Sequence, residues 1–140
     1  MIDVVAALIC NSQGEVLCMQ RGAGKYAYTD YKYEFPGGKI ESNETPQQAL
    51  RRELLEEMDL EVTVGEQVAD IEHHYPDFDI RLRVFRCTPT QMQFKLKEHA
   101  NSLWLSLDCL DQLDWAAADL AVIAQLSKLA ARGNNELNEA

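Results

Sequence analysis

The sequence predicts an α/β (α+β) domain in which a mixed β-sheet is sandwiched between helices. Short apolar segments of strand length occur before and after a central segment with helical periodicity. A second helical pattern, apolar at every third or fourth position, lies near the C-terminus. With 140 residues, 46% of them hydrophobic, the chain can bury one sizeable core, so we expect a single domain over residues 1–140.

The first half of the chain predicts three strands and one helix. The strands are Val4–Cys10, Glu15–Gln20 and Tyr33–Pro36. Two glycines and three tyrosines in residues 22–32 indicate a flexible loop that could flank a pocket. We expect the helix to begin near Thr45, since Pro46 is tolerated in a first turn, and to end at Met58 or Asp59.

The second half predicts further strands and two more helices. The strands are Glu61–Val64, Gln67–Tyr75, Asp79–Cys87 and Leu103–Ser106. The helices are Asp108–Leu113 and Asp119–Leu129, and the second repeats apolar residues at helical spacing. The polar tail 132–140 is expected to fray.

The charge of the chain argues against a nucleic-acid polymer as partner. Lys and Arg number 13 against 23 Asp and Glu, which leaves a formal net charge of −10. Polymer binders instead carry a basic face that displaces counterions from phosphates. A small polyphosphate remains compatible with the acidity if divalent cations bridge it to carboxylates.

Other features of the composition point to a cytoplasmic protein. The four cysteines form no C-x-x-C pair, and neither they nor the three histidines have the spacing of zinc ligands, so we expect reduced, buried thiols. The apolar run at residues 4–10 is short and lacks a basic flank, and no segment has the length of a membrane span. We therefore expect a cytoplasmic monomer without a membrane partner.

Three carboxylates crowd one face of the central predicted helix. Glu53, Glu56 and Glu57 fall within an arc of roughly 100°, because each residue of an α-helix turns by about 100°. Like charges at this separation repel one another and lose solvation when covered. Oxygen ligands of this kind suit Mg²⁺, with Mn²⁺ as a substitute. A solvated acidic face would explain the glutamates, but not the Gly-Gly turn before them or the apolar residues between them.

The segment 38–60, GKIESNETPQQALRRELLEEMDL, resembles the Nudix box, whose pattern is G-x5-E-x7-R-E-U-x-E-E-x-G-U with U an apolar aliphatic residue. The matching positions are Gly38, Glu44, Arg52, Glu53, Leu54, Glu56, Glu57 and Leu60. Asp59 stands where the family has glycine. That position ends the helix and needs a left-handed backbone, which Asp adopts more readily than most residues. The departure therefore concerns the helix end and not the metal site.

The resemblance implies the Nudix fold and a Mg²⁺-dependent hydrolysis of a nucleoside diphosphate linked to another group. The expected metal ligands are the Gly37 carbonyl and the carboxylates of Glu53, Glu56, Glu57 and Glu98. Glu98 lies outside the box, on a loop where a glutamate of similar proteins reaches the metal. Either Glu53 or Glu98 would activate water, and Arg52 would orient neighbouring carboxylates. The expected cations for the phosphate chain are Lys39 and Arg21.

Beyond the box, the chain is similar to the MutT-like branch of nucleoside triphosphate pyrophosphohydrolases, which act on oxidised nucleotides such as 8-oxo-dGTP, and to relatives called CTP pyrophosphohydrolases. The similarity is carried by residues 33–41, 44–46, 75–77, 104, 118–119 and 122–123. Phe35 and Phe78 can stack on a base, although core packing would equally account for either.

Asp119 is the residue that bears on which base the protein prefers. The MutT enzyme has asparagine here, whose amide both donates and accepts, as 8-oxoguanine requires. An ionised Asp119 only accepts, which suits the N4 amine of cytosine or the N1–H and N2 amine of guanine. A protonated Asp119 would recover the donor. The residue could also cap the helix that follows.

Two other functions are compatible with the box. One is hydrolysis of ADP-ribose or a dinucleoside polyphosphate. We expect this function less, because ADP-ribose enzymes of the family commonly carry an N-terminal extension and we expect none here. The other is a nucleotide-sensing domain without activity, which usually has a degenerate box. This box keeps every carboxylate.

Overall fold

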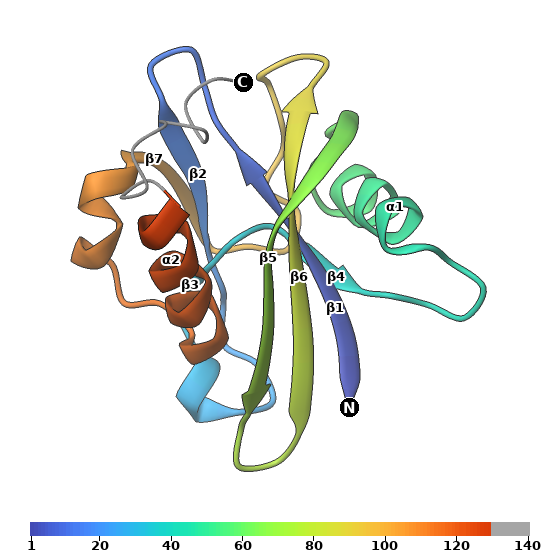
Figure 1. The fold of residues 1–140 in the computed structure, drawn as a ribbon, viewed down its shortest axis with the longest axis vertical. Coiled ribbons are helices and arrows are strands. Elements are labelled where there is room, and N and C mark those ends of the chain that lie inside the picture. Colours follow the sequence, from blue (N-terminus) through green and yellow to red (C-terminus); the bar gives the residue numbers. More distant parts are fainter. Residues whose placement is uncertain (130–140) are drawn as a thin grey trace.

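The chain folds into two β-sheets that lie between two α-helices (Figure 1). The structure is a computed structural model, and it describes residues 1–129. The strands are β1 (Ile2–Ile9), β2 (Glu15–Gln20), β3 (Tyr33–Glu34), β4 (Gly37–Lys39), β5 (Val62–His74), β6 (Asp79–Pro89) and β7 (Asn101–Ser106). The helices are α1 (Pro46–Met58), α2 (Ala117–Leu129) and the short 3-10 helices η1 (Ala27–Thr29) and η2 (Leu107–Gln112). The predicted tail 132–140 lies outside the described residues.

The larger sheet is mixed and the smaller one is antiparallel. Four strands follow the order β4-β1-β6-β5, in which β1 and β6 run parallel and the other pairs run antiparallel. The second sheet has the order β3-β2-β7. The predicted fold class, a mixed sheet between helices, is confirmed. Within residues 1–129, no helix has the length and apolarity of a membrane span.

Alternation along β1 divides the core into two layers. Val5, Ala7 and Ile9 pack with the apolar face of α1, whereas Ala6 and Leu8 pack with α2 on the opposite face. Successive side chains of a strand point to opposite faces, so a strand buried on both sides reads as one apolar run. Figure 1 shows α1 (teal) and α2 (red) on opposite sides of the strands.

The central helix has the predicted boundaries, and local side chains explain both ends. Thr45 accepts a hydrogen bond from the Gln48 amide (3.1 Å), and the Gln48 side chain accepts one from the Thr45 amide (2.9 Å), which forms a capping box. Pro46 is the first helical residue. Asp59 ends the helix in the left-handed conformation (φ 51°, ψ 35°), as the resemblance predicts.

Several predicted elements differ from the observed ones because long-range pairing decides them. The two strands expected at 61–64 and 67–75 form one strand, β5, which bends through irregular register between Val64 and Ala69. The Gly-Gly turn is itself a strand, β4, paired with β1. The helix expected at 108–113 is the 3-10 helix η2, and α2 begins at Ala117, two residues earlier than predicted.

Gly37 is required for the pairing of β4 with β1, because a Cβ there would overlap the carbonyl of Val5 and the Cα of Ala6. Both atoms belong to the backbone and cannot rotate away. We therefore expect Gly37→Ala to lower the free energy of unfolding by about 1–3 kcal/mol, the usual effect of overpacking. Denaturant unfolding measures this change. A Cβ at Gly22 would meet nothing within 4 Å, so Gly22→Ala is the matched control, and equal losses in the two variants would contradict the account.

Candidate active site

A cavity of about 750 Å³ brings together residues from both sheets, both α-helices and several of the loops that connect them. Most of the predicted site residues line it: Arg21, Phe35, Gly37, Lys39, Glu53, Glu57, Phe78, Glu98 and Asp119. Arg52 and Glu56 do not. The cavity is within the size range of pockets that enclose small ligands, about 300–1,000 Å³.

Glu53 and Glu57 form the acidic end of the cavity. They lie one turn apart on α1, opposite Gly37 and Gly38 of β4. A Cβ at Gly38 would overlap the carboxyl group of Glu53. The absent side chain of Gly38 is therefore what lets the Glu53 carboxylate lie against the β4 backbone.

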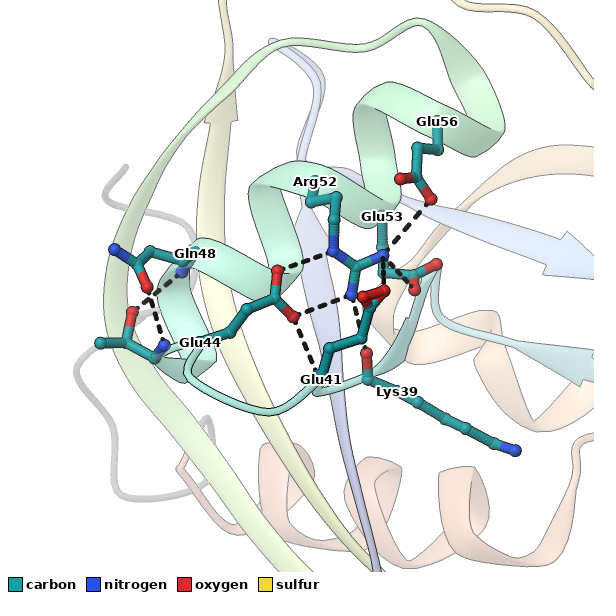
Figure 2. Close-up of polar contacts among 8 residues, drawn as sticks. Lys39, Glu41, Glu44, Gln48, Arg52, Glu53 and Glu56 are labelled. Atoms are coloured by element: carbon teal, nitrogen blue, oxygen red, sulfur yellow. Dashed lines mark hydrogen bonds and ion pairs between the residues drawn. The ribbon is translucent and has the colours of Figure 1, made fainter.

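Arg52 connects this helix face to the preceding strand and loop (Figure 2). Its guanidinium donates two hydrogen bonds to Glu44 (2.7 and 3.0 Å) and one to the carbonyl of Lys39 (3.0 Å). It also donates to Glu53 (2.9 Å) and Glu56 (3.3 Å). The Arg52 hydrogen bond lowers the pKa of Glu44. These contacts make Arg52 a partner of carboxylates, and Glu56 points to Arg52 with an exposed side chain.

The environment of Glu57 disfavours a charged carboxylate. One of its oxygens, Oε2, is buried and has no hydrogen-bond partner within residues 1–129. Burial, a hydrogen bond with Glu53 and the negative charges of Glu53, Glu98 and Glu34 raise the pKa of Glu57 to about 9. An unpartnered buried carboxylate oxygen needs a cation or a proton to be stable.

The residues at this end fit a divalent cation. Glu53, Glu57 and Glu98 supply carboxylates and Gly37 can supply a backbone carbonyl, which are the hard oxygen donors that Mg²⁺ and Mn²⁺ accept. Among residues 1–129, no three His, Cys, Asp or Glu side chains already converge on one point. Glu53 accepts from Arg52 through one carboxylate oxygen, Oε1.

Asp119 lies in the first turn of α2, the helix on the opposite side of the strands from α1 (Figure 1). Since α2 begins at Ala117, Asp119 is not its N-cap. One carboxylate oxygen accepts a hydrogen bond from the Phe35 amide (3.0 Å), and only 7% of the residue is exposed. Burial, and after it the charge of Glu34, raises the pKa of Asp119 well above its ordinary value. Asp119 is thus a buried group that can present either a donor or an acceptor.

The two predicted stacking residues have different surroundings. Phe35 is buried in the core, where its ring lies 4.9 Å from that of Trp115. Phe78 is half-buried and belongs to an aromatic cluster with Tyr75 (5.0 Å) and Tyr26 (5.3 Å). Phe78 therefore has the more accessible ring, and all three aromatic residues of the cluster line the cavity.

The predicted phosphate-binding cations also differ. Arg21 forms an ion pair with Glu34 (3.1 Å). Lys39 lines the cavity with an exposed side chain, and its ammonium group has no ion pair within residues 1–129. Lys39 is accordingly the more available of the two.

Two cavity residues were missed by sequence reasoning. Glu34 accepts from Arg21 on one oxygen and contacts His99 Nε2 (3.0 Å) through the other. The His99 side chain is 7% exposed, and its second ring nitrogen, Nδ1, is buried without a partner. Glu34 and His99 are adjacent in the sequence to Phe35 and Glu98, which were predicted as site residues. This adjacency is the signal by which they could have been found.

The match to a family model shows to which protein family this chain belongs. The NUDIX domain model matches residues 2–126. The chain belongs to the Nudix family.

Relatives of similar length support the same assignment. The 8-oxo-dGTP diphosphatase of Escherichia coli (strain K12) is 34% identical over 128 residues, which are 91% of this chain and 98% of that protein. The CTP pyrophosphohydrolase of the same strain is 35% identical over 133 residues, 94% and 95% of the two chains. The solution structure of the E. coli ORF135 protein has a TM-score of 0.81 at 33% identity and covers 97% of this chain and 95% of its own.

Membership in the Nudix family confirms two predictions, the Nudix fold and a hydrolase of phosphoanhydride bonds. The roles of the individual residues remain predictions. The cavity adds to them by bringing the carboxylates of α1 into one lining with aromatic residues and Asp119.

The pKa of Glu57 predicts how the metal-free protein responds to pH. Its folded-state pKa of about 9 lies above the ordinary value of 4.5, so the folded state holds one more proton than the unfolded state between these values. This contribution to stability is complete below pH 4.5 and is lost as the pH rises toward 9. In Glu57→Gln we expect a shallower decline of the free energy of unfolding over this window, measured with chelator present. An unchanged slope would contradict the burial of an uncompensated charge.

Proposed function

We propose that this Nudix hydrolase cleaves nucleoside triphosphates to a nucleoside monophosphate and pyrophosphate. We further propose that the nucleotide is an oxidised one such as 8-oxo-dGTP or a cytidine triphosphate, and that the activity sanitises the nucleotide pool. The observation that carries the proposal is one cavity whose lining includes the carboxylates of α1 and an aromatic cluster together with buried Asp119. In this proposal the triphosphate binds at the carboxylates and the base binds at the aromatic cluster.

Relatives with names of this kind support the substrate class. Both the 8-oxo-dGTP diphosphatase and the CTP pyrophosphohydrolase of E. coli align over more than nine-tenths of this chain. The relatives named RNA pyrophosphohydrolase align over 40% of it. An acidic chain also favours a small nucleotide over a polymer.

The acidic residues and Lys39 have different roles in this reaction. Mg²⁺, or Mn²⁺ in its place, would supply a positive charge that polarises the phosphoryl oxygens. Glu53, Glu57 and Glu98 would hold it, and either Glu53 or Glu98 would accept the proton of the attacking water. Lys39, whose ammonium group has no ion pair within residues 1–129, would contact the phosphate chain, since cations offset the charge on non-bridging oxygens.

The base would lie against the aromatic cluster. Phe78 offers the half-buried ring for stacking, and base stacking on an aromatic ring contributes about 1–3 kcal/mol. Asp119 would contact the edge of the base through the oxygen that does not accept from Phe35. We also propose a cytoplasmic monomer, in which the four free cysteines stay reduced.

Phosphorus NMR of the products tests the function. With Mg²⁺ present, we expect CTP or 8-oxo-dGTP to yield the monophosphate and pyrophosphate. We expect Glu53→Gln to lower turnover by about 10²–10⁴-fold, because it removes both a ligand and a candidate base, while the thermal midpoint stays near that of the wild type.

Three results would contradict the proposal. Diphosphate and orthophosphate as products would exclude pyrophosphohydrolase chemistry. Faster cleavage of ADP-ribose or a dinucleoside polyphosphate at limiting concentration would assign the chain to those substrates. Nucleotide binding without hydrolysis would make it a sensor.

Asp119→Asn tests base recognition with little disturbance of the fold, because the amide oxygen of Asn can still accept from Phe35. The second oxygen becomes an amide NH₂ group that only donates. We expect the ratio of kcat/KM for 8-oxo-dGTP over CTP to rise by about two- to tenfold, since one hydrogen bond contributes about 0.5–1.5 kcal/mol. Asp114→Asn is the control, since that side chain is exposed and lies outside the cavity lining. An unchanged ratio in Asp119→Asn would mean that the residue does not read the base.

A further inference from the structure

The loop that carries Glu98 is attached to the end of helix α1. The amide of Lys95 donates to the carbonyl of Met58, the last residue of α1 (2.9 Å). The ammonium group of Lys97 contacts the Asp59 carboxylate at 2.6 Å, and that of Lys95 lies 3.5 Å from the other oxygen of the same carboxylate. Asp59 therefore forms ion pairs with two lysines of the segment directly before Glu98.

The other side of Glu98 is attached to the sheet. His99 Nε2 contacts Glu34 of β3 at 3.0 Å, and the amide of Ala100 donates to the carbonyl of Gln20 in β2 at 2.8 Å. The exposed Glu98 lies between these two attachments and lines the cavity beside Glu57. A residue fixed on both sides in this way has a restricted position even though its own side chain is in solvent.

We propose that Asp59 is a positioning residue that holds Glu98 at the acidic end of the cavity through its ion pair with Lys97. This inference rests on the proposed function, in which Glu98 acts beside Glu53 and Glu57. It assigns a purpose to the position at which this chain departs from the Nudix box.

The backbone at residue 59 shows why the departure is informative. Its left-handed conformation (φ 51°, ψ 35°) is the one that glycine adopts without strain, so glycine would complete the helix equally well. Glycine has no carboxylate, however, and could not bind Lys97. An Asp at this position is strained by the left-handed backbone, but its carboxylate links the helix to the loop through Lys97.

The link is short and passes through rigid parts of the fold. Asp59 follows Glu57 by two residues and is fixed by hydrogen bonds from its amide to the carbonyls of Leu54 and Leu55. Lys97 precedes Glu98 directly. The ion pair with Lys97 therefore helps to set the distance between two carboxylates that must approach the same ion. Loss of this pair leaves only the contacts of Lys95 on that side, a backbone hydrogen bond and the longer ion pair with Asp59.

Asp59→Gly removes the carboxylate and keeps the helix end. An exposed ion pair contributes about 0.2–1 kcal/mol, which limits the expected changes to about fivefold. We expect the Lys95 and Ala100 amides, which donate to the carbonyls of Met58 and Gln20, to exchange hydrogen about two- to fivefold faster, without nucleotide or metal, and the thermal midpoint to be retained. With CTP or 8-oxo-dGTP, we expect kcat to fall by a similar factor and KM to be unchanged.

A double variant separates positioning from a general structural role. If Asp59 acts through Glu98, then Asp59→Gly should not lower kcat further in a Glu98→Gln background. Lys97→Met should change exchange and kcat in the same direction as Asp59→Gly but by less, because Lys95 still pairs with Asp59. Lys97→Arg should retain wild-type behaviour because it keeps the charge. Lys32→Met is the matched control, since it removes an ion pair of similar length (2.8 Å to Asp114) outside the cavity lining.

Each outcome decides the proposal. Unchanged exchange of the Lys95 and Ala100 amides in Asp59→Gly would overturn the proposed tether between Asp59 and this loop, and so would an equal effect of Lys32→Met on those amides. A loss of kcat that persists in the Glu98→Gln background would overturn the link to Glu98. If the wild type hydrolyses no nucleotide while exchange in Asp59→Gly accelerates as expected, the tether stands and the proposed function fails.

Discussion

The contact of Arg52 with Glu44, Glu53 and the Lys39 carbonyl is the interaction on which the active-site region depends. It joins helix α1 to β4 and to the loop between them through charge-assisted hydrogen bonds of 2.7–3.0 Å. A guanidinium suits this place because its five donors lie in a fixed plane, so it can satisfy several acceptors at once. Without it, the carboxylates of one helix face would repel one another with no internal cation.

Arg52 compensates only part of this negative charge. It reaches Glu53 and Glu56, whereas Glu57 retains a buried oxygen without a partner. The glycines of β4 add a second constraint, because they bring the backbone close to Glu53 and leave no room for side chains. Arg52 therefore orders this region, but within residues 1–129 it does not neutralise Glu57. This is the physical basis for expecting a divalent ion where the cavity ends.

Much of this site could be predicted from the sequence because its parts are local. Thr45, Pro46 and Asp59 determine both ends of α1 through short-range contacts, and helical spacing then places Glu53 and Glu57 on one face. Residues that meet only through sheet pairing could not be found in this way. Glu34 and His99 are 65 positions apart, and β4 is a strand only because β1 lies beside it. Asp119 was recognised by resemblance, but its burial depends on Phe35, 84 residues away.

Direct titration with Mn²⁺, followed by electron paramagnetic resonance, tests the central claim that the acidic end of the cavity holds a divalent ion. The account predicts binding to the wild type that tightens when a nonhydrolysable nucleotide is present. The Glu53→Gln/Glu57→Gln variant should bind at least about a hundredfold more weakly, since loss of outer partners alone typically weakens metal sites about 10–100-fold. Equal Mn²⁺ affinity in the folded double variant and the wild type would contradict it.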